Sequence, residues 1–291
     1  MLEHAEDYGS GLVGILKGAA PGAGVVFRGD DLKPGQAVLR AGRRLRPMDI
    51  GALAAMGAAE PRVRKKPRAA VLSTGDELVP PELTPGPGQV RDVNGPMLCA
   101  LLEALGAEAA FLGIVRDEEA ELERAVLAAA EGYDLVLVSG GSSAGERDAV
   151  ARVIGKNGRL LFHGLAMRPG KPAMLGEVHS VPVLGLPGHP AAAYLTAKLL
   201  AGALLRSLLG QPAEPRPVPA RLTEPLPAND GRELHCGVRL SREGGELYAE
   251  PVRTKSGLIS ALAASDGVLR VPRDCEGLPR GALVEVELEE F

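Results

Sequence analysis

Short apolar runs alternate with amphipathic stretches through the middle of the chain. The runs at 69–72 and 135–138 are unbroken, and the second is rich in β-branched residues, which is typical of strands buried on both faces of a sheet. Apolar residues at helical spacing follow Asn94 and again follow 117–119. Further strands are predicted at 111–115, 160–162, 173–175 and 183–186, and further helices at 148–154 and 191–208. This alternation predicts an α/β fold with a central, three-layer, doubly wound, mostly parallel sheet.

The two ends of the chain have a different pattern. Residues 1–66 indicate a β-rich domain with a strand at 25–28 and one helix from Pro47, whose inner face would carry Ile50, Leu53, Ala54 and Met56. Residues 213–291 contain short alternating runs at 234–240, 247–252 and 283–288, which favour a small β-barrel or sandwich, with the barrel preferred. We therefore expect three domains, at 1–66, 67–212 and 213–291.

Composition narrows the class of protein. An apolar fraction of 45% and a charged fraction of 24% predict folded domains, and a net charge of −4 does not favour a nucleic-acid partner. The three cysteines have neither metal-type spacing nor a disulfide framework, which fits a reducing cytosol. No apolar stretch approaches the ~20 residues needed to cross a bilayer. We therefore expect a cytoplasmic protein that binds no membrane.

Small-residue and acidic loops follow several predicted strands, at 73–77, 139–148 and 187–190. The carboxyl ends of parallel strands share one edge, so these loops should converge on one cleft. They offer two kinds of group. Amides and hydroxyls suited to a phosphate come from Thr74, Gly75, Gly140, Gly141, Ser142, Ser143 and Gly188, with positive charge from Arg168 and Lys171. Carboxylates come from Asp76, Glu77, Asp117 and Asp148, and Mg²⁺ between the two sets would hold an anionic, phosphorylated ligand.

Other interpretations of these loops are weaker. Any one glycine loop can be there for geometry alone. Residues 140–145 do not form the glycine pattern of a dinucleotide site, and no P-loop motif is present. His163 and His189 lack cysteine partners for zinc, so local hydrogen bonding is favoured. Ser142 or Ser143 as a nucleophile lacks an evident histidine and aspartate relay.

Four motifs together resemble a known family. They are Ser-Thr-Gly-Asp-Glu-Leu at 73–78, Ser-Gly-Gly-Ser-Ser-Ala-Gly-Glu-Arg-Asp at 139–148, Ala-Met-Arg-Pro-Gly-Lys-Pro at 166–172 and Gly-Leu-Pro-Gly-His-Pro at 185–190. In this order and spacing they resemble the molybdopterin molybdenumtransferase family, which includes the bacterial MoeA proteins and the E domain of gephyrin. The turn at 28–32 and Lys-Ser-Gly at 255–257 extend the likeness to the flanking domains.

This resemblance implies an activity and a site. The family inserts molybdenum from molybdate into adenylylated molybdopterin, with Mg²⁺ and release of AMP, in a molybdopterin-binding fold, and its members dimerise through the flanking domains. Carried over by position, the catalytic residues would be Glu77, Asp117, Asp148, Arg168 and Lys171, and the metal ligands Asp148, Glu77 and Asp31. The molybdopterin pocket would comprise Thr74, Gly75, Asp76, Asn94, Gly140, Gly141, Ser142, Ser143, Gly145, Pro187, Gly188 and Ser256.

The sequence also departs from the family pattern. Ser-Ser-Ala at 142–144 replaces Val-Ser-Val, His189 replaces an asparagine and Arg168 replaces a lysine. Two N-terminal family segments, Ser-Met-Asp-Gly-Tyr-Ala and Thr-Gly-Ala-Pro, have no counterpart. Residues 1–60 are then expected to be the tail of an N-terminally truncated domain with exposed apolar surface.

Three functions remain open at this point. The first is the enzyme, and the second is a non-catalytic molybdopterin-binding protein. The third is a nucleotide-recognition module of the competence-damage type, which the C-terminal β domain and the loop at 168–171 disfavour.

Overall fold

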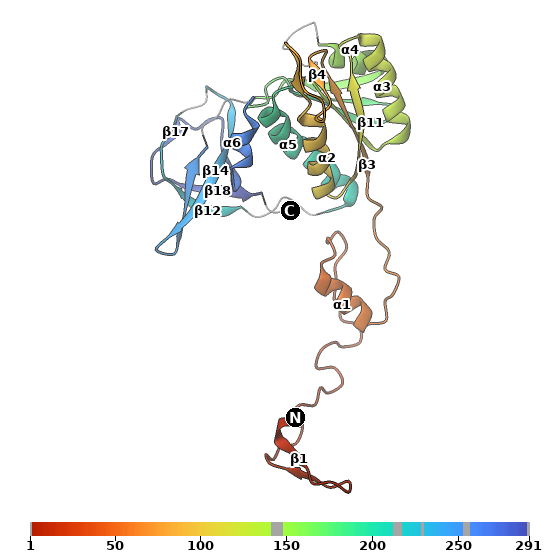
Figure 1. Cartoon of the computed structure of the whole chain (residues 1–291), viewed down its shortest axis with the longest axis vertical. Helices are drawn as coiled ribbons and strands as arrows, with labels where there is room; N and C mark the ends of the chain where they lie inside the picture. The colour runs from red at the N-terminus through yellow and green to blue at the C-terminus, as the bar shows by residue number, and fades with distance from the viewer. Residues whose placement is uncertain (1, 141–147, 212–216, 228–229, 253–256, 290–291) are drawn as a thin grey trace. The chain divides into compact units, whose positions relative to one another are not determined.

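The computed structural model of the chain describes residues 2–140, 148–211, 217–227, 230–252 and 257–289. These residues divide into two compact units, Met1–Pro61 and Arg62–Phe291 (Figure 1). The second unit carries the predicted sheet and the predicted barrel, and each unit is considered by itself below.

The N-terminal unit is small and leaves apolar side chains exposed. It contains a 3-10 turn, η1 (Leu2–His4), a hairpin of β1 (Ala5–Asp7) and β2 (Val13–Ile15), and the helix α1 (Pro47–Ala55). The predicted strand at 25–28 is wrong: residues 25–27 have no regular secondary structure and Arg28 begins a turn, because glycines at positive φ interrupt the chain on both sides of them. The helix from Pro47 is confirmed, but Ile50 and Met56 on its expected inner face are exposed.

An acidic side chain, rather than the apolar face, fixes the start of α1. Asp49 is buried and accepts hydrogen bonds from Arg43 Nε and Nη2, at 2.9 and 2.8 Å, and from the Arg46 amide at 2.9 Å. These contacts, led by the Arg43 guanidinium, lower the pKa of Asp49 to about 2. The carboxylate thus remains charged and holds the polypeptide before the helix against its first turn.

A six-stranded sheet organises the second unit. Its order is β6 (Glu108–Val115), β3 (Arg68–Thr74), β7 (Leu135–Ser139), β11 (Val181–Leu186), β10 (Met174–Val178) and β8 (Gly158–His163). The first four strands are parallel, whereas β10 is antiparallel to both of its neighbours. A short parallel pair, β4 (Leu78–Val79) and β5 (Val90–Arg91), follows β3. The mostly parallel sheet predicted from the alternating pattern is therefore present.

Helices cover both faces of this sheet (Figure 1). On one face, α3 (Glu119–Gly132) and α4 (Ala149–Asn157) bury the predicted inner residues Leu122 and Val126. On the other face, α2 (Asn94–Ala104) and α5 (Pro190–Leu209) pack against β3, β7 and β11. The strand β7 is fully buried between the two layers of helices, as its unbroken apolar run predicted.

The helix α5 qualifies the expectation that no stretch of the chain is long enough for a membrane. Among the described residues, it is one helix of 20 residues whose length and apolar composition would suffice to span a bilayer. Its side chains Leu195, Ala197, Ala201 and Leu205 are buried, and most of them belong to the core formed with α2 and the sheet. This packing makes α5 a core helix of the α/β part.

The C-terminal part is the expected closed β-barrel. Five strands close it in the order β15, β12, β18, β16, β14 and back to β15. They are β12 (Val218–Leu222), β14 (Glu233–Glu243), β15 (Glu246–Pro251), β16 (Gly267–Val271) and β18 (Leu283–Leu288). The pair β13 (Leu226–Pro227) and β17 (Gly277–Leu278) and the short helix α6 (Ile259–Ala263) complete it. Aliphatic side chains such as Leu222, Val238 and Leu269 fill the barrel, as expected for a chain without tryptophan.

A two-residue strand joins the α/β part to the barrel. The strand β9 (Met167–Arg168) lies in the loop before β10 but pairs in parallel with Glu233 and Leu234 of β14. Nearby, α5 contacts the end of β18 through Glu289, which accepts hydrogen bonds from Tyr194 Oη at 2.5 Å and Lys198 Nζ at 2.9 Å. The barrel therefore fixes the position of the predicted cationic loop at 168–171.

Candidate functional site

A cavity of about 1140 Å³ opens at the carboxyl ends of the parallel strands. It lies where the chain order of the sheet reverses, because β3 is followed by β6 on one side and by β7 on the other. Open α/β sheets bind ligands at such a switch point. The cavity is lined by Ser73, Thr74, Glu77, Leu78, Pro85, Gln89, Val90, Arg91, Asp92, Val93, Asn94, Asp117, Glu119, Ser139, Gly140, Ala149, Arg152, Pro172, Pro187, Gly188, His189, Pro190, Gly257 and Ile259.

Three strand ends meet closely at the floor of the cavity. Gly140 has a φ of +101°, and a Cβ on this residue would collide with the carbonyl oxygen of Thr74. A Cβ on Gly188 would lie 3.7 Å from Gly140 Cα. The glycine at 140 is therefore required by the close approach of β3 and β7. The carboxyl ends of β3, β7 and β11 converge as predicted, and residues 141–147 of the loop after β7 lie outside the described residues.

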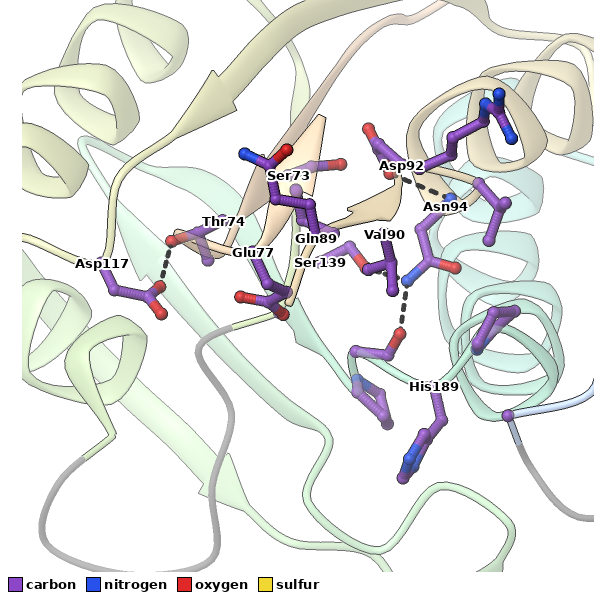
Figure 2. A pocket seen from close by; sticks show the side chains of 18 of the residues that line it. Ser73, Thr74, Glu77, Gln89, Val90, Asp92, Asn94, Asp117, Ser139 and His189 are labelled. Atoms are coloured by element: carbon purple, nitrogen blue, oxygen red, sulfur yellow. Dashed lines mark hydrogen bonds between the residues drawn. The ribbon is translucent and has the colours of Figure 1, made fainter. Parts of the chain in front are cut away.

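One side of the cavity is acidic. Thr74 Oγ1 donates a hydrogen bond to Asp117 Oδ1 at 2.7 Å (Figure 2). The Asp117 amide donates to Asp76 Oδ1 at 3.3 Å. The Glu77 carboxylate lies over Gly75, with its oxygens 2.7 and 2.9 Å from the position that a Cβ on this glycine would take. Thr74, Glu77 and Asp117, all predicted as site residues, thus lie together in the cavity wall.

The other side of the cavity carries buried polar groups (Figure 2). Asp92 Oδ1 accepts hydrogen bonds from the amides of Asn94 and Gly95, both at 3.0 Å, and so begins α2. Asn94 Nδ2 donates to Ser139 Oγ and to the Gly188 carbonyl, both at 2.8 Å. Asp92 Oδ2, Asn94 Oδ1 and Ser73 Oγ are buried without a hydrogen-bond partner among the described residues. The residues that carry these three atoms line the cavity, and the atoms themselves are buried.

Asn94 should contribute strongly to stability, because its amide ties the ends of β7 and β11 to α2. In Asn94→Ala, the buried Ser139 hydroxyl and Gly188 carbonyl lose their donor, and we expect the free energy of unfolding in urea to fall by about 2–3 kcal/mol. Asn157→Ala is a matched control, because Asn157 Nδ2 also donates twice, to Glu123 Oε1 and Val153 O, away from the cavity. An equal loss in both variants would contradict the special role of Asn94.

Several of these residues were not predicted from the sequence. Asp92, Ser73 and Ser139 line the cavity, although only Asn94 was expected from this group. Asp92 carries a recognisable signal, since an aspartate just before a predicted helix is a typical N-terminal capping residue. Ser73 and Ser139 occupy the same position, the carboxyl end of a buried strand, and that position was the available signal.

Three residues that were expected to cradle a phosphate donate their hydrogen bonds to protein groups. The Gly75 amide donates to the Val115 carbonyl at 3.3 Å, and the Gly140 amide donates to the Leu186 carbonyl at 3.2 Å. The hydroxyl of Thr74 is already donated to Asp117. The sheet edge and the acidic wall thus engage these three donors in this structure, and the role of the three residues in binding an anion stays a prediction. Gly141, Ser142, Ser143, Gly145 and Ser256 lie outside the described residues.

Asp148 is not among the residues that line the cavity and has a structural position beside it, at the start of α4. It is 1% exposed and forms the N-cap of α4, where Oδ1 accepts a hydrogen bond from the Ala151 amide at 3.1 Å. Oδ2 is buried without a hydrogen-bond partner among the described residues and lies 3.4 Å from His163 Nε2. Burial raises the pKa of this carboxyl. His163 thus lies beside Asp148, although the local hydrogen bond expected of this histidine is not formed with the buried carboxylate oxygen.

The predicted cations and metal ligands are spread more widely. Arg168 and Lys171 are exposed, and neither is among the described residues that line the cavity, although Pro172 next to them is. Asp31 is an exposed residue of the N-terminal unit. In the described part of the chain, no three His, Cys, Asp or Glu side chains are grouped to hold a metal ion. The catalytic and metal roles of these residues stay predictions.

Three family profiles match successive parts of the sequence. The MoeA N-terminal region (domain I and II) matches residues 1–57. A probable molybdopterin binding domain matches residues 70–207, and the MoeA C-terminal region (domain IV) matches residues 219–288. The matches cover both compact units and include the cavity.

Curated proteins and solved structures agree with these profiles. A molybdopterin molybdenumtransferase of Haemophilus influenzae is 35% identical over 89% of this chain and 65% of its own length. Molybdopterin molybdenumtransferase 1 of Mycobacterium tuberculosis is 32% identical over 96% of this chain and 68% of its own. The crystal structure of a molybdopterin biosynthesis MoeA protein from Pyrococcus horikosii is 34% identical, covering 99% of this chain and 71% of its own, with a TM-score of 0.82. The chain thus spans about two thirds of the length of these relatives.

Proposed function

We propose, because this chain belongs to the MoeA family of molybdopterin molybdenumtransferases, that it inserts molybdenum from molybdate into adenylylated molybdopterin and releases AMP. Its homologues act in the biosynthesis of the molybdenum cofactor, and the family sets aside the competence-damage interpretation. The cavity at the ends of β3, β7 and β11 would hold the substrate. Its volume, about 1140 Å³, is sufficient for a ligand larger than a nucleotide.

The observation that carries this proposal is the wall of buried acceptors. Asp92 Oδ2 and Asn94 Oδ1 are buried and accept no hydrogen bond from the described protein. A buried acceptor without a donor is costly, so such groups favour a ligand that donates. The amino group and the ring N–H of a pterin are donors of this kind. We assign the pterin end of the substrate to this wall.

The acidic wall suits the other end of the substrate. Glu77 and Asp117 are exposed carboxylates, and Mg²⁺ is commonly held by one or two carboxylates together with substrate phosphates and waters. That mode of binding fits a site without three grouped protein ligands among the described residues. Mg²⁺ would neutralise charge on the phosphate and on molybdate there. The Thr74 hydroxyl holds Asp117 in place for this role.

The remaining residues of the cavity position the substrate and limit water. Gly257 and Ile259 of the C-terminal part line the cavity together with the strand ends of the α/β part. A ligand bound there contacts both parts, which β9 and Glu289 already hold together. The reaction therefore would take place in a site with protein on several sides.

We extend the proposal to the organisation of the protein. The matches at 1–57, 70–207 and 219–288 support a division near 1–66, 67–212 and 213–291. We also propose that the protein is cytoplasmic and that it forms a homodimer through its flanking domains. Light scattering and subcellular fractionation test these two points.

Molybdenum insertion by the purified chain tests the activity. The protein is incubated with adenylylated molybdopterin, molybdate and Mg²⁺, and AMP release and molybdenum content of the pterin are measured. We expect AMP release that depends on both molybdate and Mg²⁺. Binding of adenylylated molybdopterin without AMP release would contradict the enzyme and leave a binding protein, and failure to bind would contradict the site itself.

A further inference from the structure

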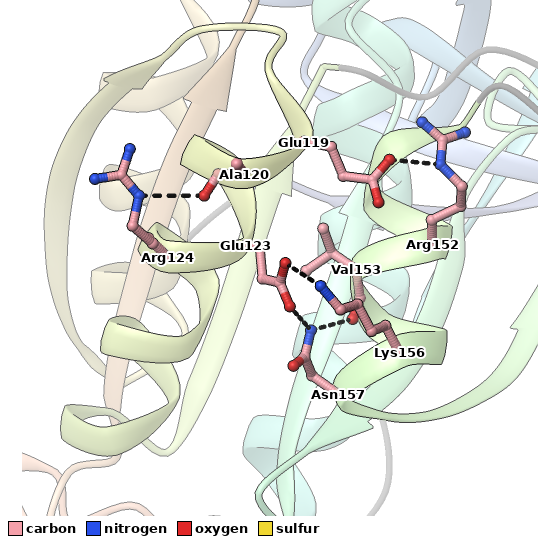
Figure 3. Close-up of polar contacts among 8 residues, drawn as sticks. All are labelled: Glu119, Ala120, Glu123, Arg124, Arg152, Val153, Lys156 and Asn157. Carbon is pink, nitrogen blue, oxygen red and sulfur yellow. Dashed lines mark hydrogen bonds and ion pairs between the residues drawn. The ribbon is translucent and has the colours of Figure 1, made fainter.

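Two ion pairs connect α3 to α4, one helical turn apart (Figure 3). Arg152 Nε lies 2.7 Å from Glu119 Oε2, and Lys156 Nζ lies 2.7 Å from Glu123 Oε2. Glu119 and Glu123 lie on the same face of α3, and Arg152 and Lys156 lie on the same face of α4. Only the first pair reaches the cavity, because Glu119 and Arg152 are among its lining residues and Glu123 and Lys156 are not.

The charges of the cavity leave an anionic ligand few cations. Its described lining includes the carboxylates of Glu77, Asp92, Asp117 and Glu119 but the guanidinium groups of only Arg91 and Arg152. Arg91 Nε donates to the carbonyls of Pro81 and Leu83, both at 3.0 Å, which orients it along its own loop. The expected cations Arg168 and Lys171 do not line the described cavity. Besides the Mg²⁺ proposed for the acidic wall, a phosphate in the cavity therefore needs a cation from the protein.

The backbone amides that were expected to bind a phosphate do not take the place of this cation. The amides of Gly75 and Gly140 donate to Val115 and Leu186 within the sheet edge. Arg152 lies in the first turns of α4, where the positive end of the helix dipole also favours an anion. Arg152 is therefore a positively charged residue that lines the cavity and lies near the amino end of a helix.

We propose that Arg152 is a phosphate-binding residue of the cavity and that Glu119 holds its guanidinium at the wall until a phosphate takes the place of the carboxylate. This inference rests on the proposed function and assigns a role to residues outside its motifs. A guanidinium binds carboxylate and phosphate in the same planar, bidentate geometry, whereas a lysine acts as a point charge. The exchange is inexpensive because both side chains of the pair are nearly half exposed, at 45% and 42%.

Binding of AMP to the full chain, measured by calorimetry, tests this role. In Arg152→Ala, we expect the dissociation constant for AMP to rise about tenfold or more, because a charge-assisted contact to the phosphate is lost. In Glu119→Gln, which removes the competing charge, we expect AMP to bind severalfold more tightly. The dependence of binding on salt should be shallower in Arg152→Ala than in the wild type.

The neighbouring pair provides matched controls. Lys156→Ala and Glu123→Gln break the same kind of bridge between the same helices, outside the cavity. If Arg152 serves only to hold α3 to α4, all four variants will leave AMP affinity equal, and the inference is wrong. A change confined to the Arg152 and Glu119 variants, with unchanged melting temperatures, supports it.

The outcomes separate the inference from the proposed function. If the wild type binds AMP and Arg152→Ala binds it equally well, the phosphate role of Arg152 fails and the proposed function stands. If the wild type binds neither AMP nor adenylylated molybdopterin, both fail. Nucleoside without phosphate is the second ligand control, because Arg152→Ala should leave any adenosine affinity unchanged.

Discussion

Gly140→Ala is expected to lower the free energy of unfolding of the pocket-bearing unit by roughly 2–6 kcal/mol. The residue has a φ of +101°, which costs any side chain conformational strain. The added Cβ would also collide with the backbone carbonyl of Thr74, which cannot move without displacing β3. The ends of β3 and β7 would separate, so the floor of the cavity would change together with the stability.

Urea-induced unfolding measures this effect, with Gly155→Ala as the control. Gly155 lies in α4 without a positive φ, and no other side chain or distant backbone atom comes within 4 Å of the position that its Cβ would take. Alanine there should therefore be neutral or stabilising by about 0.5–1 kcal/mol. Similar unfolding curves for the two variants would show that the close approach of β3 and β7 relaxes easily. Ligand affinity should fall in Gly140→Ala and not in Gly155→Ala.

Asp148→Ala is expected to reduce molybdenum insertion by about 100-fold or more, which corresponds to about 2.7 kcal/mol of transition-state stabilisation. The carboxylate begins α4 beside the cavity and keeps Oδ2 without a hydrogen-bond partner among the described residues. The alanine variant also loses the helix cap, at a cost of about 1 kcal/mol. A second substitution separates the two roles.

Asp148→Asn retains the cap and removes the charge, because asparagine is as good an N-cap as aspartate. If the charge matters in the reaction, this variant will be as inactive as Asp148→Ala but as stable as the wild type. Full activity in Asp148→Asn would reduce Asp148 to a structural residue. Asp134→Asn is the matched control, because Asp134 accepts from the Arg68 amide at the amino end of β3, away from the cavity.

The order of elements in the α/β part was accessible from the sequence because local patterns decide it. The buried run at 135–138 became β7, and the inner residues Leu122 and Val126 of α3 were identified by spacing alone. The strand expected at 25–28 did not form, although its residues have high β propensity. These residues have no partner strand, and turns lie on both sides of them. Strand propensity without a pairing partner does not make a strand.

The site was predictable in its location but less so in its donors. Motifs at strand ends placed Thr74, Glu77, Asp117 and Gly188 in one cavity, as expected from the parallel sheet. The sequence does not reveal that the amides of Gly75 and Gly140 are used by neighbouring strands, because those bonds depend on register. Arg152 was missed for a similar reason, since an arginine on a helix surface carries no signal until the opposite helix is placed.

The strand β9 has a consequence for exchanging parts between members of this family. Because Met167 and Arg168 are registered to Glu233 and Leu234, the loop that carries the family's cationic motif belongs to two modules at once. A chimaera that took its barrel from a relative would have to keep this parallel pairing and the acceptor at Glu289. A crossover in the proline-rich segment at 211–219, where the sequence alone would place it, therefore requires that β14 of the grafted barrel match β9 of the host, because a crossover before 167 would divide the six-stranded sheet.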